Sequence, residues 1–211
     1  MVINSKFLYN PNKLEIFRNR KPKPLGTFRR SSVLILLVEK DGEDHIVLEK
    51  RAAGLKSQPG DISFPGGRIE DGETEVQAAL RETMEEIGLP EGEIDLLGPM
   101  DFFISPFNTI IFPFVGKTDR IEFDPSPGEV AEILLVPIRF FIDNPPKVHY
   151  LKLGTFPDDD FPYDLIVNGR NYNFSSSDYP QLFWVWQGHT IWGFTARILN
   201  EFLHIIDVES I

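Results

Sequence analysis

Apolar positions in the first half of the chain fall into short runs that predict β-strands. Residues 31–51 read SSVLILLVEKDGEDHIVLEKR, with two apolar runs on either side of Asp41-Gly42. Such a pair between apolar runs is typical of a tight turn that joins two antiparallel strands. Further strands are predicted at 94–97, 102–105, 109–117 and 132–136.

One segment between these strands, residues 74–88, has the spacing of an amphipathic helix. Thr74 is a good N-cap, and Gln77 three residues later completes a capping box. Gly88 is expected to end the helix, and Pro90 prevents its continuation. The positions predicted to be buried are Val76, Ala79, Leu80, Thr83 and Ile87.

The second half of the chain is less regular. A short helix is predicted at 137–142, a strand at 182–187, and a closing amphipathic helix at 189–206. Residues 143–180, between these elements, are rich in proline, aspartate, serine and asparagine. This segment predicts an irregular insert with one hairpin around the Asn-Gly pair at 168–169.

Mixed strands and helices without an internal repeat predict one domain of the α/β (α+β) class. We expect an N-terminal helix and basic connector at 1–29, with a helix at about 10–18, and a single domain at 30–205. The pattern leaves three roles open for the insert at about 143–180: a lid, a dimer contact or a cover for a sheet edge.

Composition and charge limit the kinds of partner that the chain is expected to bind. The chain has 21 basic and 32 acidic residues and a net charge of −11. Phosphate backbones bind basic surfaces, so we expect no nucleic-acid partner and no docking to anionic membranes. The absence of cysteine excludes disulfides and thiolate metal sites. No apolar run is long enough to span a membrane, and the N-terminus lacks a signal core, so a cytoplasmic location is expected by elimination.

Carboxylates are concentrated at the end of the predicted helix at 74–88. Glu82, Glu85 and Glu86 fall within one stretch, where the helix dipole disfavours negative charge. Glu82 and Glu86 are one turn apart and share a side of the helix. A charged face can simply be solvated, but a bound cation would also offset this repulsion. Mg²⁺ or Mn²⁺ bound by carboxylates can support hydrolysis of a phosphoanhydride.

Two neighbouring features favour the cation. Gly66 and Gly67 lie shortly before the helix and let the backbone approach a ligand closely. Glu73 and Arg81 can form an ion pair that ties the preceding loop to the helix. The segment therefore predicts a rigid support around the carboxylates.

This stretch resembles the signature of the Nudix hydrolases. That signature runs glycine, five residues, glutamate, seven residues, then Arg-Glu-aliphatic-any-Glu-Glu-any-Gly-aliphatic. Thr83 departs from it, standing where a bulky aliphatic residue is usual, and this bears on packing. The matching positions are Gly67, Glu73, Arg81, Glu82, Glu85, Glu86 and Gly88.

The resemblance implies a fold and roles for these residues. The family fold is an α/β/α sandwich around a mixed β-sheet, with Glu73 and Arg81 in structural roles. Glu82 and Glu86 would be ligands of Mg²⁺ or Mn²⁺, and Glu85 would be a third ligand or the base that acts on water. The carbonyl group of Gly66 or Gly67 would complete the coordination of the metal.

A second resemblance concerns the substrate. Residues 48–67, LEKRAAGLKSQPGDISFPGG, are similar to a signature of the coenzyme A pyrophosphatase subgroup of this family. The departures from that signature are Val47, Glu49 and Lys56. The matches are Leu48, Arg51, Ala52, Gly60, Phe64, Pro65, Gly66 and Gly67.

The second resemblance implies that Arg51 and Lys56 grip phosphate groups of the substrate and that Phe64 belongs to the same binding segment. Lys56 keeps the charge of the usual arginine but loses its planar fork. The C-terminal HTIWGFTARIL also resembles the closing helix of this subgroup. Either Glu129 or Glu132 can supply an extra base, although solvated loop acids are the simpler interpretation.

These resemblances predict metal-dependent hydrolysis of coenzyme A or its derivatives to adenosine 3′,5′-bisphosphate and 4′-phosphopantetheine. Two alternatives remain open. One is a Nudix hydrolase of another nucleotide, such as ADP-ribose, a dinucleoside polyphosphate or an oxidised nucleotide. The other is a catalytically silent Nudix domain that binds a nucleotide or a protein. A homodimer is compatible with the family.

Overall fold

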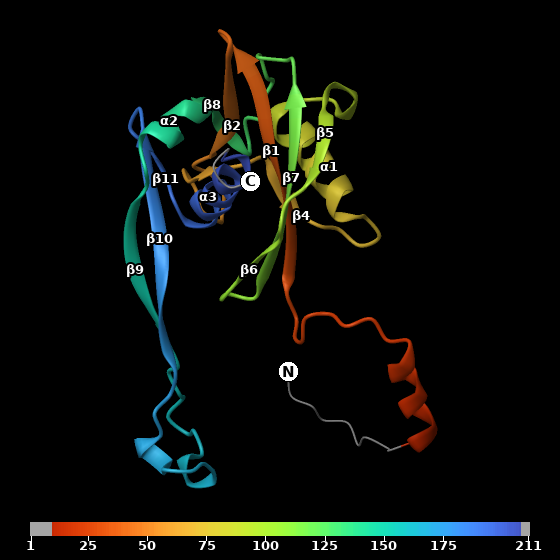
Figure 1. Ribbon diagram of the computed structural model, residues 1–211, viewed down its shortest axis with the longest axis vertical. Coiled ribbons are helices and arrows are strands. Elements are labelled where there is room, and N and C mark those ends of the chain that lie inside the picture. Colours follow the sequence, from red (N-terminus) through yellow and green to blue (C-terminus); the bar gives the residue numbers. More distant parts are fainter. Residues whose placement is uncertain (1–9, 208–211) are drawn as a thin grey trace.

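A mixed β-sheet forms the centre of the molecule (Figure 1). The computed structural model describes residues 10–207, and within them this sheet has eight strands. The strand order is β3-β2-β1-β7-β5, with β8 beside β2, β4 beside β1 and β6 beside β7. Only β1 and β7 run parallel among the pairs described. The strands are β1 (Arg29–Lys40), β2 (Glu43–Arg51), β3 (Ile62–Ser63), β4 (Gly66–Arg68), β5 (Asp95–Pro99), β6 (Phe103–Ser105), β7 (Thr109–Thr118) and β8 (Val130–Pro137).

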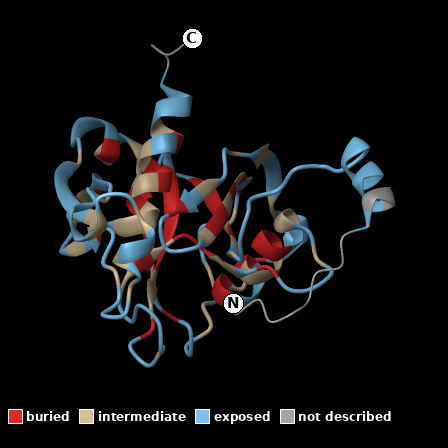
Figure 2. Cartoon of the chain, turned by 90° about the horizontal axis from the view of Figure 1, so that it is seen from below, coloured by how far each residue is buried: buried red, intermediate tan, exposed pale blue. Residues whose placement is uncertain are grey.

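Alternate side chains of β1 enter two separate hydrophobic cores. Leu34 and Leu36 pack on one face with residues of α1 (Glu75–Ile87). Ile35 packs on the other face with residues of α3 (Gly193–Ile206). Successive residues of a strand point to opposite faces, so one buried strand supplies both cores. The buried residues gather between the sheet and its helices in Figure 2.

The face that carries α3 is also covered by α2 (Ile138–Asp143) and by a second, three-stranded sheet. The strands of this second sheet are β9 (Lys147–Gly154), β10 (Ser176–Trp186) and β11 (His189–Ile191). The helix α1 therefore lies on one side of the central sheet and α3 on the other (Figure 1). This arrangement confirms the predicted α/β/α sandwich around a mixed sheet.

Regular strands occupy much of the segment for which the sequence predicted irregular backbone. β9 and β10 pair over their lengths as a long antiparallel ribbon that extends beyond the body of the molecule (Figure 1). The Asn-Gly pair at 168–169 lies near its tip, beside two short 3₁₀ helices, η3 (Tyr163–Leu165) and η4 (Gly169–Asn171). One hairpin is present in this segment, as predicted, but residues 155–175 separate its paired strands, so the Asn-Gly pair is not a tight turn between them.

The predicted start of the last helix is wrong by four residues. The helix begins at Gly193, because residues 189–191 pair as β11 with the end of β10. Gln187 and Gly188 join these strands with φ values of 47° and 85°. Two positive φ values are typical of a type I′ hairpin turn, which the Gln-Gly sequence did not reveal.

At the N-terminal end, the helix predicted at about 10–18 is a 3₁₀ helix, η1 (Pro11–Arg18). The rest of the predicted N-terminal unit is a connector that leads into β1, and residues 1–9 of that unit lie outside the described residues. No helix within residues 10–207 has both the length and the apolar character needed to cross a membrane.

Candidate active site

The ends of α1 are fixed by its own sequence. The Thr74 hydroxyl accepts from the backbone N–H of Gln77, whose side chain accepts from the backbone N–H of Thr74. Gly88 adopts the left-handed conformation at φ 68° and ends the helix. The predicted capping box and C-terminal stop are therefore confirmed, and they set the rotation at which the carboxylates emerge.

The three glutamates of α1 divide between two environments. Glu86 is only 6% exposed, and the side chain of Glu82 is 18% exposed, so both turn toward the sheet. The side chain of Glu85 is 51% exposed and lies on the outer side of the helix. Thr83 is fully buried, and its hydroxyl donates to the carbonyl oxygen of Ala79 at 2.7 Å. That bond satisfies the polar atom at the position where the family usually has an aliphatic side chain.

The glycine pair of β4 lies directly against the buried carboxylates. The backbone N–H of Gly66 donates to Glu86 Oε2 at 2.7 Å. A Cβ atom on Gly66 would lie 2.3 Å from the carbonyl oxygen of Ser32, and its φ of 151° also favours glycine. A Cβ atom on Gly67 would lie 2.3 Å from the carboxyl carbon of Glu82. Glycine at 66 therefore lets β4 pair closely with β1, and glycine at 67 lets the backbone approach Glu82.

Arg81 connects the acidic residues around the helix. It forms a two-point ion pair with Glu73, at 2.9 and 3.2 Å, as the sequence predicted. Its Nη1 atom lies 3.0 Å from Glu82 and 3.1 Å from Glu85. The hydrogen bonds with Arg81 lower the pKa of Glu73, and those with Glu73 raise the pKa of Arg81. Arg81 also donates to the carbonyl of Arg68, so it ties the loop to the helix.

Burial makes the inner carboxylates reluctant to ionise. It is the main cause that raises the pKa of Glu86 to about 7, and the charges of Glu82 and Glu129 add to it. The hydrogen bond from Gly66 and the charge of Arg51 act in the opposite direction. Burial also raises the pKa of Glu82, against the effect of Arg81. A nearby cation would relieve this repulsion.

The donor set fits a hard divalent cation, although the side chains are turned to other partners. Among residues 10–207, no three His, Asp or Glu side chains are gathered closely enough to hold a metal ion. Arg81 holds Glu82 and Glu85, while Gly66 holds Glu86. The donors are all oxygens, and the glycines leave the backbone open to them, which suits Mg²⁺ or Mn²⁺. The metal ligands inferred from the sequence therefore remain a prediction, and the oxygen donors present there support it.

Two further glutamates, on other elements, act on the same carboxylates. Glu49 on β2 is fully buried, and its pKa is raised to about 9, first by burial and then by the charge of Glu86. Glu129 is exposed, and its charge raises the pKa of Glu49, Glu82 and Glu86. The sequence offered Glu129 only as an optional extra base and did not indicate that Glu49 is buried. Glu132, the other acid that the sequence offered as an extra base, instead lies 3.7 Å from His189.

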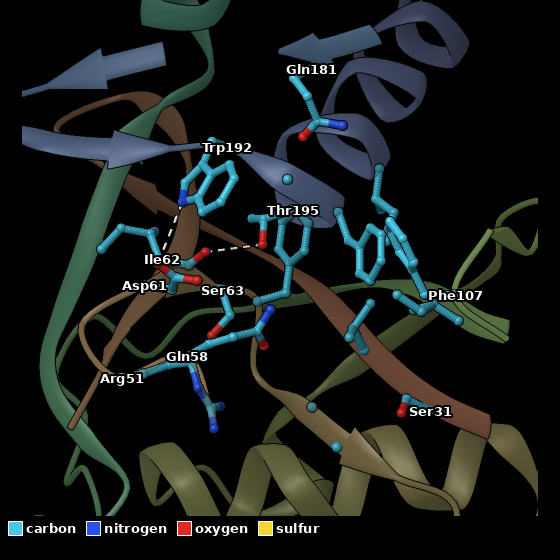
Figure 3. A pocket seen from close by; sticks show the side chains of 18 of the residues that line it. Ser31, Arg51, Gln58, Asp61, Ile62, Ser63, Phe107, Gln181, Trp192 and Thr195 are labelled. Atoms are coloured by element: carbon cyan, nitrogen blue, oxygen red, sulfur yellow. Dashed lines mark hydrogen bonds between the residues drawn. The ribbon is translucent and has the colours of Figure 1, made fainter. Parts of the chain in front are cut away.

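A pocket of about 550 Å³ adjoins the glycine pair. Gly66, Gly67 and Arg51 line it together with residues of the long hairpin and of α3. Figure 3 shows Arg51 and Gln58 near one end and Gln181 near the other. Its wall is held by two hydrogen bonds drawn there, from Trp192 to Asp61 at 3.4 Å and from Thr195 to the carbonyl of Ile62 at 3.0 Å.

The predicted substrate residues meet this pocket unequally. Arg51 and Phe64 line it, and Arg51 also donates to the carbonyl of Ser57 at 3.4 Å. Lys56 is exposed and is not among the described residues that line the pocket. Of the predicted pair, Arg51 lines the pocket and Lys56 does not, and a grip on phosphate stays a prediction. The aromatic side chains that line the pocket, and so are available to a base, are Phe64, Phe107, Tyr179, Trp192 and Phe194.

Comparisons with known proteins agree on one family. The NUDIX domain matches residues 28–151, more than half of the 211 residues. Mouse peroxisomal coenzyme A diphosphatase NUDT7 is 32% identical over 132 residues, which are 62% of this chain and 55% of the mouse protein. Nudix hydrolase 3 of Caenorhabditis elegans is 44% identical over 114 residues, 51% of this chain and 47% of that protein. The chain spans about half the length of these curated relatives.

One relative matches along nearly its whole length. The uncharacterized Nudix hydrolase NudL of Cronobacter sakazakii is 28% identical over 192 residues, 90% of this chain and 89% of that protein. Among solved structures, a MutT/nudix family protein from Enterococcus faecalis has a TM-score of 0.52 at 13% identity, over 95% of this chain and 70% of that chain. At this identity the likeness concerns the fold alone.

Proposed function

Because this chain belongs to the Nudix family, we propose that it hydrolyses the diphosphate of a nucleoside diphosphate derivative, and that this substrate is coenzyme A or an acylated form of it. The observation that carries the reaction class is the position of the glutamates. Glu86 is buried and Glu82 is partly buried, both against the Gly66–Gly67 backbone, and that backbone also lines the pocket. A diphosphate in the pocket would therefore lie beside the carboxylates.

The carboxylates would hold Mg²⁺ or Mn²⁺, and the cation would supply neutralisation of the diphosphate charge and activation of a water. Glu82 and Glu86 would be the inner ligands, with a carbonyl of Gly66 or Gly67. Glu85 lies at the outer edge, where Arg81 is its one ion-pair partner among residues 10–207. It is therefore free to turn inward as a further ligand or to accept the proton of the attacking water. Glu73 keeps Arg81 in place through its two-point ion pair.

Coenzyme A suits the remaining features. It carries a 3′-phosphate besides the diphosphate, and Arg51 supplies a guanidinium at the pocket wall. The pocket also has apolar surface from Phe64, Phe107 and Leu151, which fits the pantetheine arm or an acyl group better than a second charged nucleotide. The mouse relative named a coenzyme A diphosphatase adds support for this substrate class.

A substrate panel tests the proposal. Coenzyme A, acetyl-coenzyme A, ADP-ribose, NADH and diadenosine polyphosphates are each incubated with the protein and Mg²⁺ or Mn²⁺. Products are identified by mass. We expect the fastest turnover for coenzyme A or its acetyl form, with adenosine 3′,5′-bisphosphate as one product. Faster hydrolysis of ADP-ribose or a dinucleotide would contradict the substrate and leave the reaction class intact.

The second candidate is hydrolysis of another nucleotide. Glu49 and Lys56 replace two residues of the coenzyme A signature, and Lys56 does not line the pocket. Without Lys56 at the pocket, the phosphate clamp of the coenzyme A signature would be incomplete, although Arg29 lines the pocket together with Arg51. Equal rates for coenzyme A and its 3′-dephospho form would favour this candidate. A silent binding domain is the least supported alternative, because all three glutamates of the signature helix are present.

A further inference from the structure

One buried acid, Glu49, has no counterpart in the signature that this segment resembles. It is fully buried on β2, and its Oε1 atom accepts a hydrogen bond from Ser63 at 3.1 Å. Its Oε2 atom is buried and has no hydrogen-bond partner among residues 10–207. A buried oxygen without a partner is costly in either state: an ionised carboxylate lacks a donor there, and a protonated one lacks an acceptor.

The register of β2 turns Glu49 toward α1. Val47 packs in the core beneath α1, whereas Ile46 and Leu48 pack in the core of the opposite face. Glu49 is two residues beyond Val47 on the same strand, so it lies on the α1 face. The charge of Glu86, also on that face, raises the pKa of Glu49 more than the charge of Glu129 does.

Glu49 and Glu86 are both hydrogen-bonded to one short segment of the chain. Ser63 holds Glu49, and Gly66 holds Glu86 at 2.7 Å. Ser63 and Gly66 are three residues apart, so their separation is at most about 10 Å.

The loop before β8 is a third segment that contacts the region of Glu49 and Glu86. The backbone N–H of Ser126 donates to the carbonyl of Glu86 at 2.8 Å, and that of Ala52 donates to the carbonyl of Glu129 at the same distance. The loop therefore links the end of α1 to the end of β2. Glu129 stands at its exposed side, and its charge acts on both Glu49 and Glu86.

A charge partner within the protein does not explain Glu49. Arg51 is two residues away, but its Nε atom is itself buried without a hydrogen-bond partner among the described residues. No ion pair between Glu49 and Arg51 is present among residues 10–207 that would satisfy both. A cation bound to Glu49 Oε2 would satisfy this oxygen without any change in the strand.

We propose that Glu49 is an additional carboxylate of the cation site, binding a divalent metal through Oε2 from the sheet side, opposite the ligands on α1. This inference rests on the proposed function, because it takes Glu86 as a metal ligand. It adds a ligand from β2 that the signature helix does not supply. Thr at this position, as in the resembled signature, would offer a hydroxyl in place of a charge.

Direct titration of Mn²⁺ tests this role without substrate. The full chain, freed of metal, is titrated with Mn²⁺ at fixed pH, and free Mn²⁺ is measured by electron paramagnetic resonance. Glu49→Gln and Glu49→Thr are expected to weaken Mn²⁺ binding by about tenfold or more. Glu132→Gln is the matched control, because it removes one charge from the neighbouring strand β8, and it should change affinity less than about twofold.

The outcomes separate the two levels of the proposal. If both Glu49 variants bind Mn²⁺ as tightly as the wild type while Glu86→Gln binds weakly, Glu49 is a structural residue and the inference is overturned. Using two variants guards against a folding defect in one, which circular dichroism would reveal. Failure of the proposed function would be seen elsewhere, as an absence of metal-dependent turnover of any nucleotide by the wild type.

Discussion

The two helices on either side of the central sheet are nearly equal in length but differ in what they bury. α3 buries Ala196, Ile198, Leu199 and Phe202, all apolar. α1 buries Ala78, Ala79, Leu80 and Ile87, and with them Thr83 and Glu86. The face of α3 is thus built for cohesion. The face of α1 gives up part of its apolar contact to bring charge against the sheet.

The ends of the two helices differ in the opposite sense. α1 has a full capping box and a left-handed glycine stop. At α3, Trp192 occupies the N-cap and makes no side-chain capping bond within the described chain. Capping bonds thus stabilise α1, whose buried face is partly polar. Tertiary packing stabilises α3, which lacks a side-chain capping bond within the described chain. We infer that stability is concentrated on the α3 face and chemistry on the α1 face.

The largest effect is expected from Glu86→Gln. Loss of an inner carboxylate should lower metal-dependent turnover by about 100-fold or more, because even outer partners of metal ligands are worth 10- to 100-fold. Thermal unfolding without metal should occur at the same or a higher temperature, since a buried acid is removed. Glu75→Gln, at the start of α1, where the side chain is partly exposed and pairs with Arg30, is the control and should retain activity. If Glu86→Gln unfolded at a temperature low enough to explain its loss of activity, Glu86 would be a structural residue.

The opposite pattern is expected on the other face. Leu199→Ala removes a fully buried side chain from α3 and should lower the free energy of unfolding by about 2–5 kcal/mol. Urea denaturation measures this change. The fraction that remains folded should bind Mn²⁺ with unchanged affinity, because Leu199 lies in the core on the face opposite α1. Weakened Mn²⁺ binding by folded Leu199→Ala would contradict the division between the faces.

Stability without metal should depend on pH through the α1 face. The pKa of Glu86 is raised from 4.5 to about 7 and that of Glu49 to about 9, so the folded state binds more protons than the unfolded state. The free energy of unfolding should therefore fall as pH rises from about 4.5 to about 9. Urea denaturation of the metal-free protein across this range measures it.

Matched variants identify the source of that slope. Glu86→Gln and Glu49→Gln should each make the fall with pH shallower, because each removes one of the raised pKa values. Leu199→Ala should shift the whole curve without changing its slope. An identical slope in all four proteins would show that these carboxylates do not govern the pH dependence.

The smallest effect is expected at the cap of α1. Thr74→Ala removes one half of the capping box and should lower the free energy of unfolding by about 1 kcal/mol. Gln77→Ala removes the other half and should have a similar or smaller effect in the same urea experiment. No change in either variant would mean that tertiary contacts, rather than these bonds, hold the start of α1.

Local signals made much of the α1 face predictable from the sequence. Thr74, Gln77 and Gly88 mark the helix by bonds within a few residues, and the spacing of Glu73 and Arg81 predicts their ion pair. The same holds for the turn at Asp41-Gly42, where both residues have positive φ.

Features set by distant parts of the chain were not predictable in the same way. The burial of Glu49 requires β3 and β8 to cover both edges of β2, which no local pattern specifies. Its one local signal is its shared parity with Val47. A hairpin was predicted in this segment, but its regular strands were not, because most side chains of β9 are exposed. The turn at 187–188 lacks the usual Asn-Gly signal.

A crystal structure of the protein with Mn²⁺, in which anomalous scattering locates the ion, tests directly whether the acidic face of α1 binds a cation. We predict an anomalous peak between the carboxylates of Glu82 and Glu86, beside the Gly66–Gly67 backbone, with Arg81 withdrawn from Glu82. A peak elsewhere, or no peak while Arg81 still holds Glu82 and Gly66 still holds Glu86, would contradict the claim that the acidic face of α1 is a cation site.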